Sequence, residues 1–215
     1  MTVTEITVGI MRTNCYVIES EQKNAVVIDP GDEGDRLTDR LTNLGVKVRY
    51  IFLTHAHFDH TGAVKEVQKR FPEAKVVLMK EDEEILLDPS LVVNRVQGKF
   101  GERYHIKPDL LVSDGEVLKL DELSFVFIAT PGHSKGSCTI LLCDQLFTGD
   151  TLFAGMCGRT DLYGGSQSDM KRSLARLGNL EGDYEILPGH GPGSTLAIER
   201  FRNSYLRFAM GKEVL

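Results

Sequence analysis

Four possible metal ligands stand within six residues of this chain, at His55, His57, Asp59 and His60. Imidazole nitrogens and carboxylate oxygens are the groups with which proteins hold zinc, iron and manganese. A polar, solvated loop is the alternative interpretation, and so dense a cluster of ligand types disfavours it. The segment therefore predicts a metal site.

The elements on either side of these residues indicate how they are positioned. Residues 51–53 form an apolar run typical of a buried parallel strand, and apolar residues recur at helical spacing over 61–71. Open α/β sheets place their sites beyond the carboxyl ends of their strands. We therefore predict a strand, then a ligand loop, then a helix.

Three further candidates, His133, Asp150 and His190, each follow a short apolar run that ends in glycine or a Pro-Gly pair. Taken singly, each is more typical of an ordinary loop or turn residue. Their shared position at predicted strand ends favours a common site with the first cluster. The sixth histidine, His105, does not fit this pattern.

Seven ligand-type side chains are more than one zinc ion holds. A catalytic zinc usually takes three protein ligands, so seven would supply three to each of two ions and one shared carboxylate. Two ions about 3.5 to 4 Å apart share a bridging water. Such a water ionises near pH ~7, so the predicted nucleophile is a metal-bridging hydroxide.

The motifs in this chain resemble those of the metallo-β-lactamase superfamily, in particular its glyoxalase II-like branch. They are, in order, Asn14-Cys15-Tyr16, Ile28-Asp29-Pro30-Gly31, Thr54-His55-Ala56-His57-Phe58-Asp59-His60-Thr61-Gly62, Pro131-Gly132-His133, Thr148-Gly149-Asp150 and Gly189-His190. The resemblance implies that one metal takes His55, His57 and His133. It implies that the second metal takes Asp59, His60 and His190, and that Asp150 bridges the two. Asp29 is expected to brace the ligand loop rather than to contact metal.

The resemblance also implies the fold, a four-layer αββα sandwich of two mixed β-sheets flanked by helices, in the α/β (α+β) class. Apolar runs predict strands over residues 6–10, 16–18, 25–28, 49–53, 75–78, 117–120, 123–128, 139–142 and 185–187, and helices over 35–44, 61–71, 168–177 and 196–209. This alternation fits such a sandwich better than a bundle or an all-β barrel.

We expect a single metallo-β-lactamase-like domain over residues 1–215. Full-length glyoxalase II carries a helical domain beyond the last ligand histidine, and the short segment after His190 leaves no room for one. Residues 196–209 are expected to form one amphipathic helix that packs on the core.

Composition excludes several classes of protein. The chain is 41% hydrophobic and 26% charged, enough for one domain with a sizeable core. A net charge of −6 disfavours nucleic acid as a partner. The chain has no apolar run of about 18 residues and no signal-like start, so we expect no membrane partner and a cytoplasmic location. Oligomeric state is not predicted.

The four cysteines show no Cys-x-x-Cys spacing. Cys15, Cys138 and Cys143 flank apolar strand residues, so we expect buried, reduced thiols. Cys157 lies in a glycine-rich loop near the predicted site. A packing role is favoured over a nucleophilic role there, because no base is identifiable beside it.

Asp150 narrows the reaction, because classical metallo-β-lactamases usually place a cysteine or serine at that position. The resemblance therefore disfavours a β-lactamase and favours a small-molecule thioester substrate of the hydroxyacyl-glutathione type. Asp59 and Asp150 are the predicted catalytic residues, Asp59 steering the attacking hydroxide. Two divalent ions are expected, zinc first and iron or manganese as alternatives.

Arg159 is the candidate substrate-binding residue, since it stands where glyoxalase II carries a basic residue. It would pair with a substrate carboxylate, and an ion pair with Asp161 is an equal alternative. Residues 88–108, which include Asn94, Arg95, Lys99, Phe100, Tyr104 and His105, lack clear periodicity and are candidates to cover the site.

A second enzymatic interpretation remains open, because residues 157–161 also resemble persulfide dioxygenases. Those enzymes hold one iron, here by His55, His133 and Asp150. The final motif, residues 188–192, favours a hydrolase instead. Hydrolysis of other esters, lactones or phosphodiesters ranks lower, and a non-catalytic metal-binding scaffold ranks low because all seven ligand positions are filled.

Overall fold

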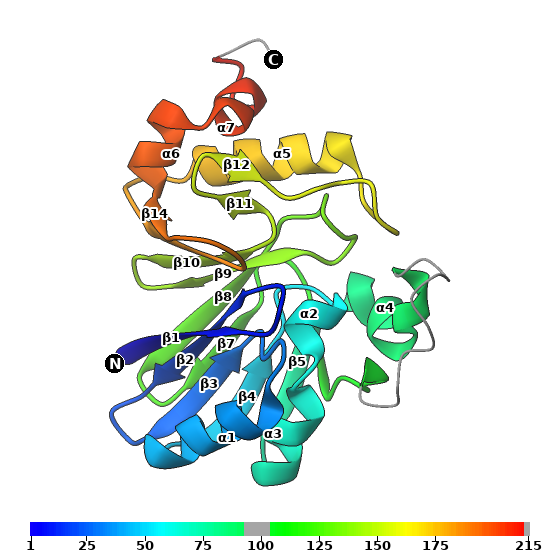
Figure 1. The fold of residues 1–215 in the computed structure, drawn as a ribbon. Helices are drawn as coiled ribbons and strands as arrows, with labels where there is room; N and C mark the ends of the chain where they lie inside the picture. The colour runs from blue at the N-terminus through cyan, green and yellow to red at the C-terminus, as the bar shows by residue number, and fades with distance from the viewer. Residues whose placement is uncertain (93–103, 213–215) are drawn as a thin grey trace.

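A computed structural model describes residues 1–92 and 104–212 of the chain (Figure 1). Two six-stranded sheets pack face to face. The helices α1 and α3 cover the outer face of the first sheet, and α5, α6 and α7 lie on the second (Figure 1). These four layers confirm the predicted αββα sandwich.

The strands pair as two mixed sheets. The first sheet has the spatial order β1 (Thr2–Val8), β2 (Thr13–Glu19), β3 (Asn24–Ile28), β4 (Lys47–Phe52), β5 (Lys75–Met79) and β6 (Leu110–Val112). The second has the order β14 (Ser194–Thr195), β13 (Glu185–Pro188), β10 (Gln145–Gly149), β9 (Cys138–Leu142), β8 (Leu123–Ala129) and β7 (Val117–Leu120). Strands β3 to β6 run parallel, as do β10 and β13, and the remaining pairs within the two sheets are antiparallel.

Helices and short elements fill the connections. The α-helices are α1 (Gly34–Asn43), α2 (Phe58–Thr61), α3 (Val64–Arg70), α4 (Glu83–Leu87), α5 (Gln167–Gly178), α6 (Leu196–Arg202) and α7 (Ser204–Ala209). The 3₁₀ turns are η1 (Lys80–Asp82) and η2 (Pro89–Leu91), and β11 (Leu152–Phe153) pairs with β12 (Met156–Cys157) as a separate hairpin.

Strand β4 shows why two core layers form. Because side chains alternate across a strand, Ile51 packs toward the helices and Phe52 packs between the sheets. The Phe52 ring lies 5.1 Å from Phe125 and 5.0 Å from Phe127, both in edge-to-face contact. The buried parallel strand predicted over residues 51–53 is therefore confirmed, except that β4 ends at Phe52.

Several predicted boundaries were wrong. The predicted strand 6–10 instead spans Thr2–Val8, because a turn with positive φ at Gly9 and Arg12 ends it. The predicted helix 61–71 is two helices, and the first begins at Phe58, inside the expected ligand loop. The predicted single helix 196–209 breaks at Asn203, whose backbone is extended and whose side chain caps α7.

Candidate metal centre

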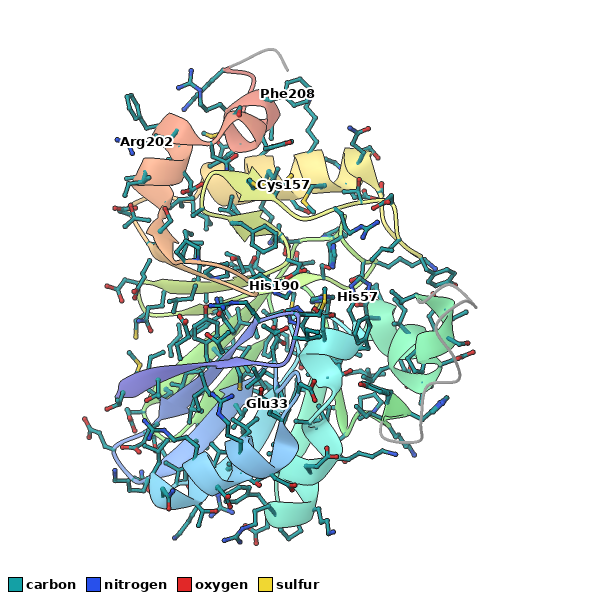
Figure 2. The ribbon with its side chains drawn as sticks, viewed as in Figure 1. Glu33, His57, Cys157, His190, Arg202 and Phe208 are labelled. Carbon is teal, nitrogen blue, oxygen red and sulfur yellow. The ribbon has the colours of Figure 1, made fainter. Side chains whose placement is uncertain are left out.

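Seven side chains singled out in the sequence lie together where the two sheets meet. His55 and His57 follow β4, His133 follows β8, Asp150 follows β10 and His190 follows β13. The short helix α2 carries the other two, Asp59 and His60. Figure 2 shows His57 and His190 near the middle of the molecule, between the part that contains α1 and the part that contains α5.

One group, here called the first triad, consists of His55, His57 and His133. One nitrogen of each ring lies within 4.8 Å of the others, and the ring centroids are 4.5 to 4.8 Å apart. The three residues are at most 3% exposed. The loops after β4 and β8 thus place three imidazoles in a buried pocket.

A second group, the second triad, consists of Asp59, His60 and His190, whose ligand atoms also lie within 4.8 Å of one another. The Nε2 atom of His190 is 3.2 Å from Oδ2 of Asp59. His60 is fully buried, whereas the side chains of Asp59 and His190 are 13% and 25% exposed. This triad is the more open of the two.

Asp150 lies between the triads. Its Oδ1 is 3.4 Å from Nε2 of His60, and its Oδ2 is 3.4 Å from Nε2 of His133 and 3.6 Å from Nε2 of His190. Backbone packs tightly around it, since a Cβ at Gly189 would lie 2.4 Å from Oδ1. Asp150 therefore lies close to histidines of both triads, and its role as a shared ligand stays a prediction.

The polar atoms at the centre are suited to a cation. The Nε2 atoms of His55, His57 and His133 and Oδ1 of Asp150 are buried and make no hydrogen bond with any residue that the structure describes. Unpaired buried polar atoms are costly, and four converging ones require an explanation. Imidazole and carboxylate donors fit zinc, iron or manganese, so the residues fit a divalent metal.

Contacts on the far side of the rings orient the histidines. The Nδ1 atoms of His133 and His190 lie 2.8 Å and 3.1 Å from the carbonyl oxygens of Arg159 and Met11. Since a carbonyl only accepts, each Nδ1 carries a proton, and the Nε2 atom of each ring is directed toward the centre.

Thr54 and Asp29 orient one histidine of each triad, His55 and His60 respectively. Asp29 Oδ2 accepts from His60 Nδ1 at 2.9 Å and from the Thr54 hydroxyl at 2.6 Å. The Thr54 oxygen lies 3.1 Å from Nδ1 of His55, and the Thr54 amide donates to Asp29 Oδ1 at 2.8 Å. Asp29 thus braces the ligand segment, as expected, from a backbone with φ of 51°.

Electrostatics differ between the triads. Burial, reinforced by the neighbouring imidazoles, holds the pKa of His55 well below its usual value. The same causes, burial first and then His133, lower the pKa of His57 to about 3. His55 and His57 therefore favour the neutral imidazole, the form that binds metal.

Carboxylates dominate the second triad. Burial acts to lower the pKa of His60, but Asp150 and Asp29 outweigh it and the pKa is raised well above its usual value. Burial also acts to lower the pKa of His190, but the hydrogen bond with Asp59 outweighs burial and the pKa is raised. For Asp150, burial acts to raise the pKa, yet His60 and the other imidazoles lower it. The metal-free second triad therefore holds protons that a cation would replace.

Arg159, the predicted substrate contact, pairs with Asp161 through bonds of 2.7 Å and 2.8 Å, and both side chains are largely exposed. The structure thus contains the ion pair proposed as the alternative role. The Arg159 carbonyl makes a contact that the sequence did not suggest, as the acceptor for His133.

Only part of the predicted covering segment, residues 88–108, is described, and Asn94, Arg95, Lys99 and Phe100 lie outside the described residues. Tyr104 is described, and its ring lies 6.4 Å from that of Phe58, which directly precedes the candidate ligand Asp59 in the sequence. Nearby, a small cavity of about 40 Å³ is lined by Val8, Gly9, Ile10, Met11, Thr13, Gly31, Asp32, Phe58, Asp59 and Tyr104.

The cysteine predictions hold in part. Cys15 and Cys138 are buried free thiols, whereas Cys143 is exposed, because it lies in the turn between β9 and β10 with φ of 54°. The expectation of a buried Cys143 was therefore wrong. Burial raises the pKa of Cys157 to about 11, which agrees with a packing role rather than a reactive thiolate.

Asp82 was missed by the sequence analysis. It is fully buried beside the first triad and accepts hydrogen bonds from Ala56, Ser134 and Gly136. It belongs to no recognisable motif. The one available signal was its position just after the apolar strand β5, the same signal that identified the ligands.

The αββα sandwich and its histidine and aspartate cluster define a metal-dependent hydrolase. The family model described as the metallo-beta-lactamase superfamily matches residues 8–190, and the chain belongs to this superfamily.

Among the described helices, none has both the length and the apolar composition needed to cross a membrane.

Two relatives match nearly the full chain. Hydroxyacylglutathione hydrolase GloC of Haemophilus influenzae is 32% identical over 210 residues, which cover 96% of this chain and 98% of that protein. The probable metallo-hydrolase YqgX of Bacillus subtilis is 35% identical over 204 residues, which cover 93% and 94%. These similarities support membership of the glyoxalase II-like branch.

Solved structures agree. BLEG-1, described as a B3 metallo-beta-lactamase, has a TM-score of 0.86 at 33% identity and covers 95% of this chain and 99% of its own. TTHA1623 in a di-iron-bound form has a TM-score of 0.80 at 33% identity, with 94% and 99% covered. ETHE1 from Myxococcus xanthus has a TM-score of 0.78 at 26% identity, with 100% and 92% covered.

Proposed function

We propose that this hydrolase cleaves thioesters of the hydroxyacyl-glutathione type. The observation that carries the proposal is Asp150, a carboxylate shared between the two triads where classical metallo-β-lactamases usually have cysteine or serine. The near full-length similarity to a hydroxyacylglutathione hydrolase supports the same substrate class.

We further propose two divalent ions. The first would be held by His55, His57 and His133, the second by Asp59, His60 and His190, and Asp150 would contact both. Bound ions supply Lewis acidity and lower the pKa of water, which provides a nucleophile near neutral pH. Zinc is the first choice, and the di-iron form of a similar protein supports iron as the alternative.

The chain's own residues fix the orientation of the candidate ligands and of the attacking water. Protons on the Nδ1 atoms of His133 and His190 are fixed by backbone carbonyls, so the rings cannot turn their Nε2 atoms away. His60 and His190 outweigh burial and lower the pKa of Asp59, so this side chain stays a carboxylate at neutral pH. Asp59 can therefore accept a hydrogen bond from the attacking water and orient that water. We propose this as the catalytic role of Asp59, which acts together with Asp150.

The leaving group needs little help. A thiol has a pKa of about 8.5 and departs as a thiolate near neutral pH, so no general acid is required. We propose that Arg159 contacts a substrate carboxylate, which requires it to exchange its partner Asp161 for the substrate.

Two other activities have specific support. Residues 157–161 and the similarity to ETHE1 keep a single-iron persulfide dioxygenase as the second candidate, with His55, His133 and Asp150 as its ligands. The similarity to BLEG-1 makes β-lactam hydrolysis the third. The cytoplasmic location, the single domain over residues 1–215 and the absence of nucleic-acid and membrane partners stay predictions.

The test is a parallel assay of purified protein reconstituted with zinc, manganese or, anaerobically, ferrous iron. We expect thiol release from S-lactoylglutathione, no oxygen uptake with glutathione persulfide and no opening of a chromogenic β-lactam. Oxygen uptake with persulfide, without thioester cleavage under any metal, would establish the dioxygenase instead. Opening of the β-lactam alone would establish a β-lactamase.

A further inference from the structure

Asp82 is a buried carboxylate outside the seven ligand positions. It ends the 3₁₀ turn η1 after β5, and none of its surface is exposed. Its Oδ2 accepts hydrogen bonds from the Ala56 amide at 3.0 Å and the Ser134 hydroxyl at 2.7 Å. Its Oδ1 accepts one from the Gly136 amide at 2.6 Å. All three donors are neutral.

These donors belong to the two loops that form the first triad. Ala56 stands between His55 and His57, and Ser134 directly follows His133. A single carboxylate therefore ties the loop after β4 to the loop after β8. No other side chain among the described residues is shown to accept hydrogen bonds from both of these loops.

The segment around Asp82 is fitted closely to the second of these loops. A Cβ at Gly136 would lie 2.5 Å from the Asp82 nitrogen and 2.7 Å from its Cβ, so only glycine permits the approach. Two residues beyond Asp82, Glu84 pairs with Lys135 at 2.7 Å. The carboxylate is thus held in one position relative to His133.

Charge gives Asp82 a second role. The three imidazoles of the first triad bring no negative charge to a dication, Asp59 belongs to the second triad, and Asp150 lies between the two triads. Within the described part of the chain, Asp82 makes no ion pair with lysine or arginine, and its contacts are donations from neutral groups. Burial raises the pKa of Asp82, and a dication bound in the first triad would favour its ionised form.

We propose that Asp82 is a positioning residue for the metal of the first triad. It holds the His57 and His133 loops at ligand spacing through its hydrogen bonds to both, and its carboxylate would add negative charge close to a dication bound there. The inference rests on the proposed binding of metal at that triad.

The test isolates each triad in turn by removing a ligand from the other. In a His190→Ala background, one cobalt ion should remain bound, in the first triad. Adding Asp82→Asn should weaken the binding of this ion about tenfold or more, which is the usual effect of removing a residue that supports metal ligands. In a His133→Ala background the remaining ion lies in the second triad, and Asp82→Asn should leave its affinity unchanged within about twofold. Titration with Co²⁺, followed by visible absorption, measures both without any substrate.

The matched control is Glu199→Gln. Glu199 is 1% exposed and also accepts from three neutral donors, Gly155, Ser194 and Asn203, none of them in a ligand loop. This substitution should lower the melting temperature as Asp82→Asn does, without weakening cobalt in the His190→Ala background. Equal loss of cobalt affinity in both variants would overturn the inference, as would wild-type affinity in Asp82→Asn.

A milder variant, Ser134→Ala, keeps the charge and removes one of the three donors, and it applies even if Asp82→Asn fails to fold. It should weaken first-triad cobalt by a few fold, and no change would contradict the positioning role. Failure of the proposed function is separately visible. A wild-type protein that binds two ions but cleaves no thioester would refute the substrate and leave the role of Asp82 standing.

Discussion

The two triads are built from similar ligands but in different surroundings. The first consists of three imidazoles that are at most 3% exposed, between loops tied together by Asp82. The second combines the buried His60 with the more open His190 and Asp59, and it is crowded with carboxylates. Burial is therefore the main cause of the lowered pKa values of His55 and His57 in the first triad, and pairing with carboxylates raises those of His60 and His190 in the second.

Because of this difference, the two sites of one metal centre are expected to exchange their ions at different rates. The first triad presents three buried Nε2 atoms that have no hydrogen-bond partner among the described residues. The second is partly satisfied without metal, because His60 and His190 pair with Asp29, Asp59 and Asp150. We therefore expect the first site to hold its ion more firmly.

The largest effect is expected from Asp150→Ala, which removes the one group shared by both triads. We expect loss of metal and a fall in kcat/KM of about 10³-fold or more, because several kcal/mol of charge stabilisation depend on the metals. His57→Ala should lose the first ion with a comparable fall. Metal analysis and thioester kinetics measure both.

The control for these variants is Asp114→Ala, an exposed carboxylate that pairs with Arg176 away from the triads. It should keep metal and activity. Circular dichroism should show the fold intact in all three proteins. Full activity in both Asp150→Ala and His57→Ala would refute the two-metal model.

Thr54→Val should have the next largest effect. Its hydroxyl links His55, of the first triad, to Asp29, which holds His60 of the second. Valine keeps the shape and removes the link, so we expect about 10- to 100-fold weaker metal binding. Thr54→Ser restores the hydroxyl and should recover most of the affinity, and an equal loss in both variants would show that packing alone matters.

Chelation should remove the two ions in separate steps. The side chain of His190 is 25% exposed, whereas His133 is almost fully buried, so the second-triad ion should leave at least about tenfold faster, since a solvent-exposed ligand is easier to displace. Stopped-flow release into a coloured chelator measures the rates. A single phase that releases both ions together would contradict the comparison.

In metal-free protein the triads should respond to acid differently. The pKa of His57 falls from 6.5 to about 3 on folding, so between these values the unfolded chain binds a proton that the folded chain does not. Stability should therefore fall as pH falls, by about 1.4 kcal/mol per pH unit for one proton. His57→Gln should remove about one proton from this slope.

His60 gives the opposite sign. Its pKa is raised by folding, so its contribution is present below about pH 6.5 and is lost as pH rises. His60→Gln should leave the acid slope between pH 3 and 6.5 unchanged. Urea unfolding at a series of pH values measures both variants, and equal slopes for His57→Gln and wild type would contradict the burial argument.

The smallest effect is expected from Arg159→Ala. Arg159 lies on the surface and already pairs with Asp161, and exposed pairs contribute about 0.2 to 1 kcal/mol. KM for a glutathione thioester should rise about two- to fivefold with kcat unchanged. A thioester whose thiol lacks carboxylates should show no change, and an equal rise for both substrates would exclude carboxylate recognition.

Prediction from sequence succeeded where local pattern carried the information. The candidate ligands after β4, β8, β10 and β13 each stand just beyond an apolar run, and the structure brings them together, as expected for side chains at strand ends. Prediction failed where neighbours in space decide. Asn203 breaks the last helix because its side chain caps α7, and Cys143 is exposed because it falls in a tight turn.

By itself, the sequence determined the type and number of the candidate ligands, because ligand chemistry is a local property, and the resemblance of its motifs to the superfamily implied the αββα class. Only the tertiary structure gave the distances within the group, with Asp150 3.4 Å from both His60 and His133. It alone revealed Asp82, whose hydrogen bonds cross 26 residues to Ala56 and 52 to Ser134. The physical reason is that burial and charge balance depend on packing between distant segments, which no local pattern records.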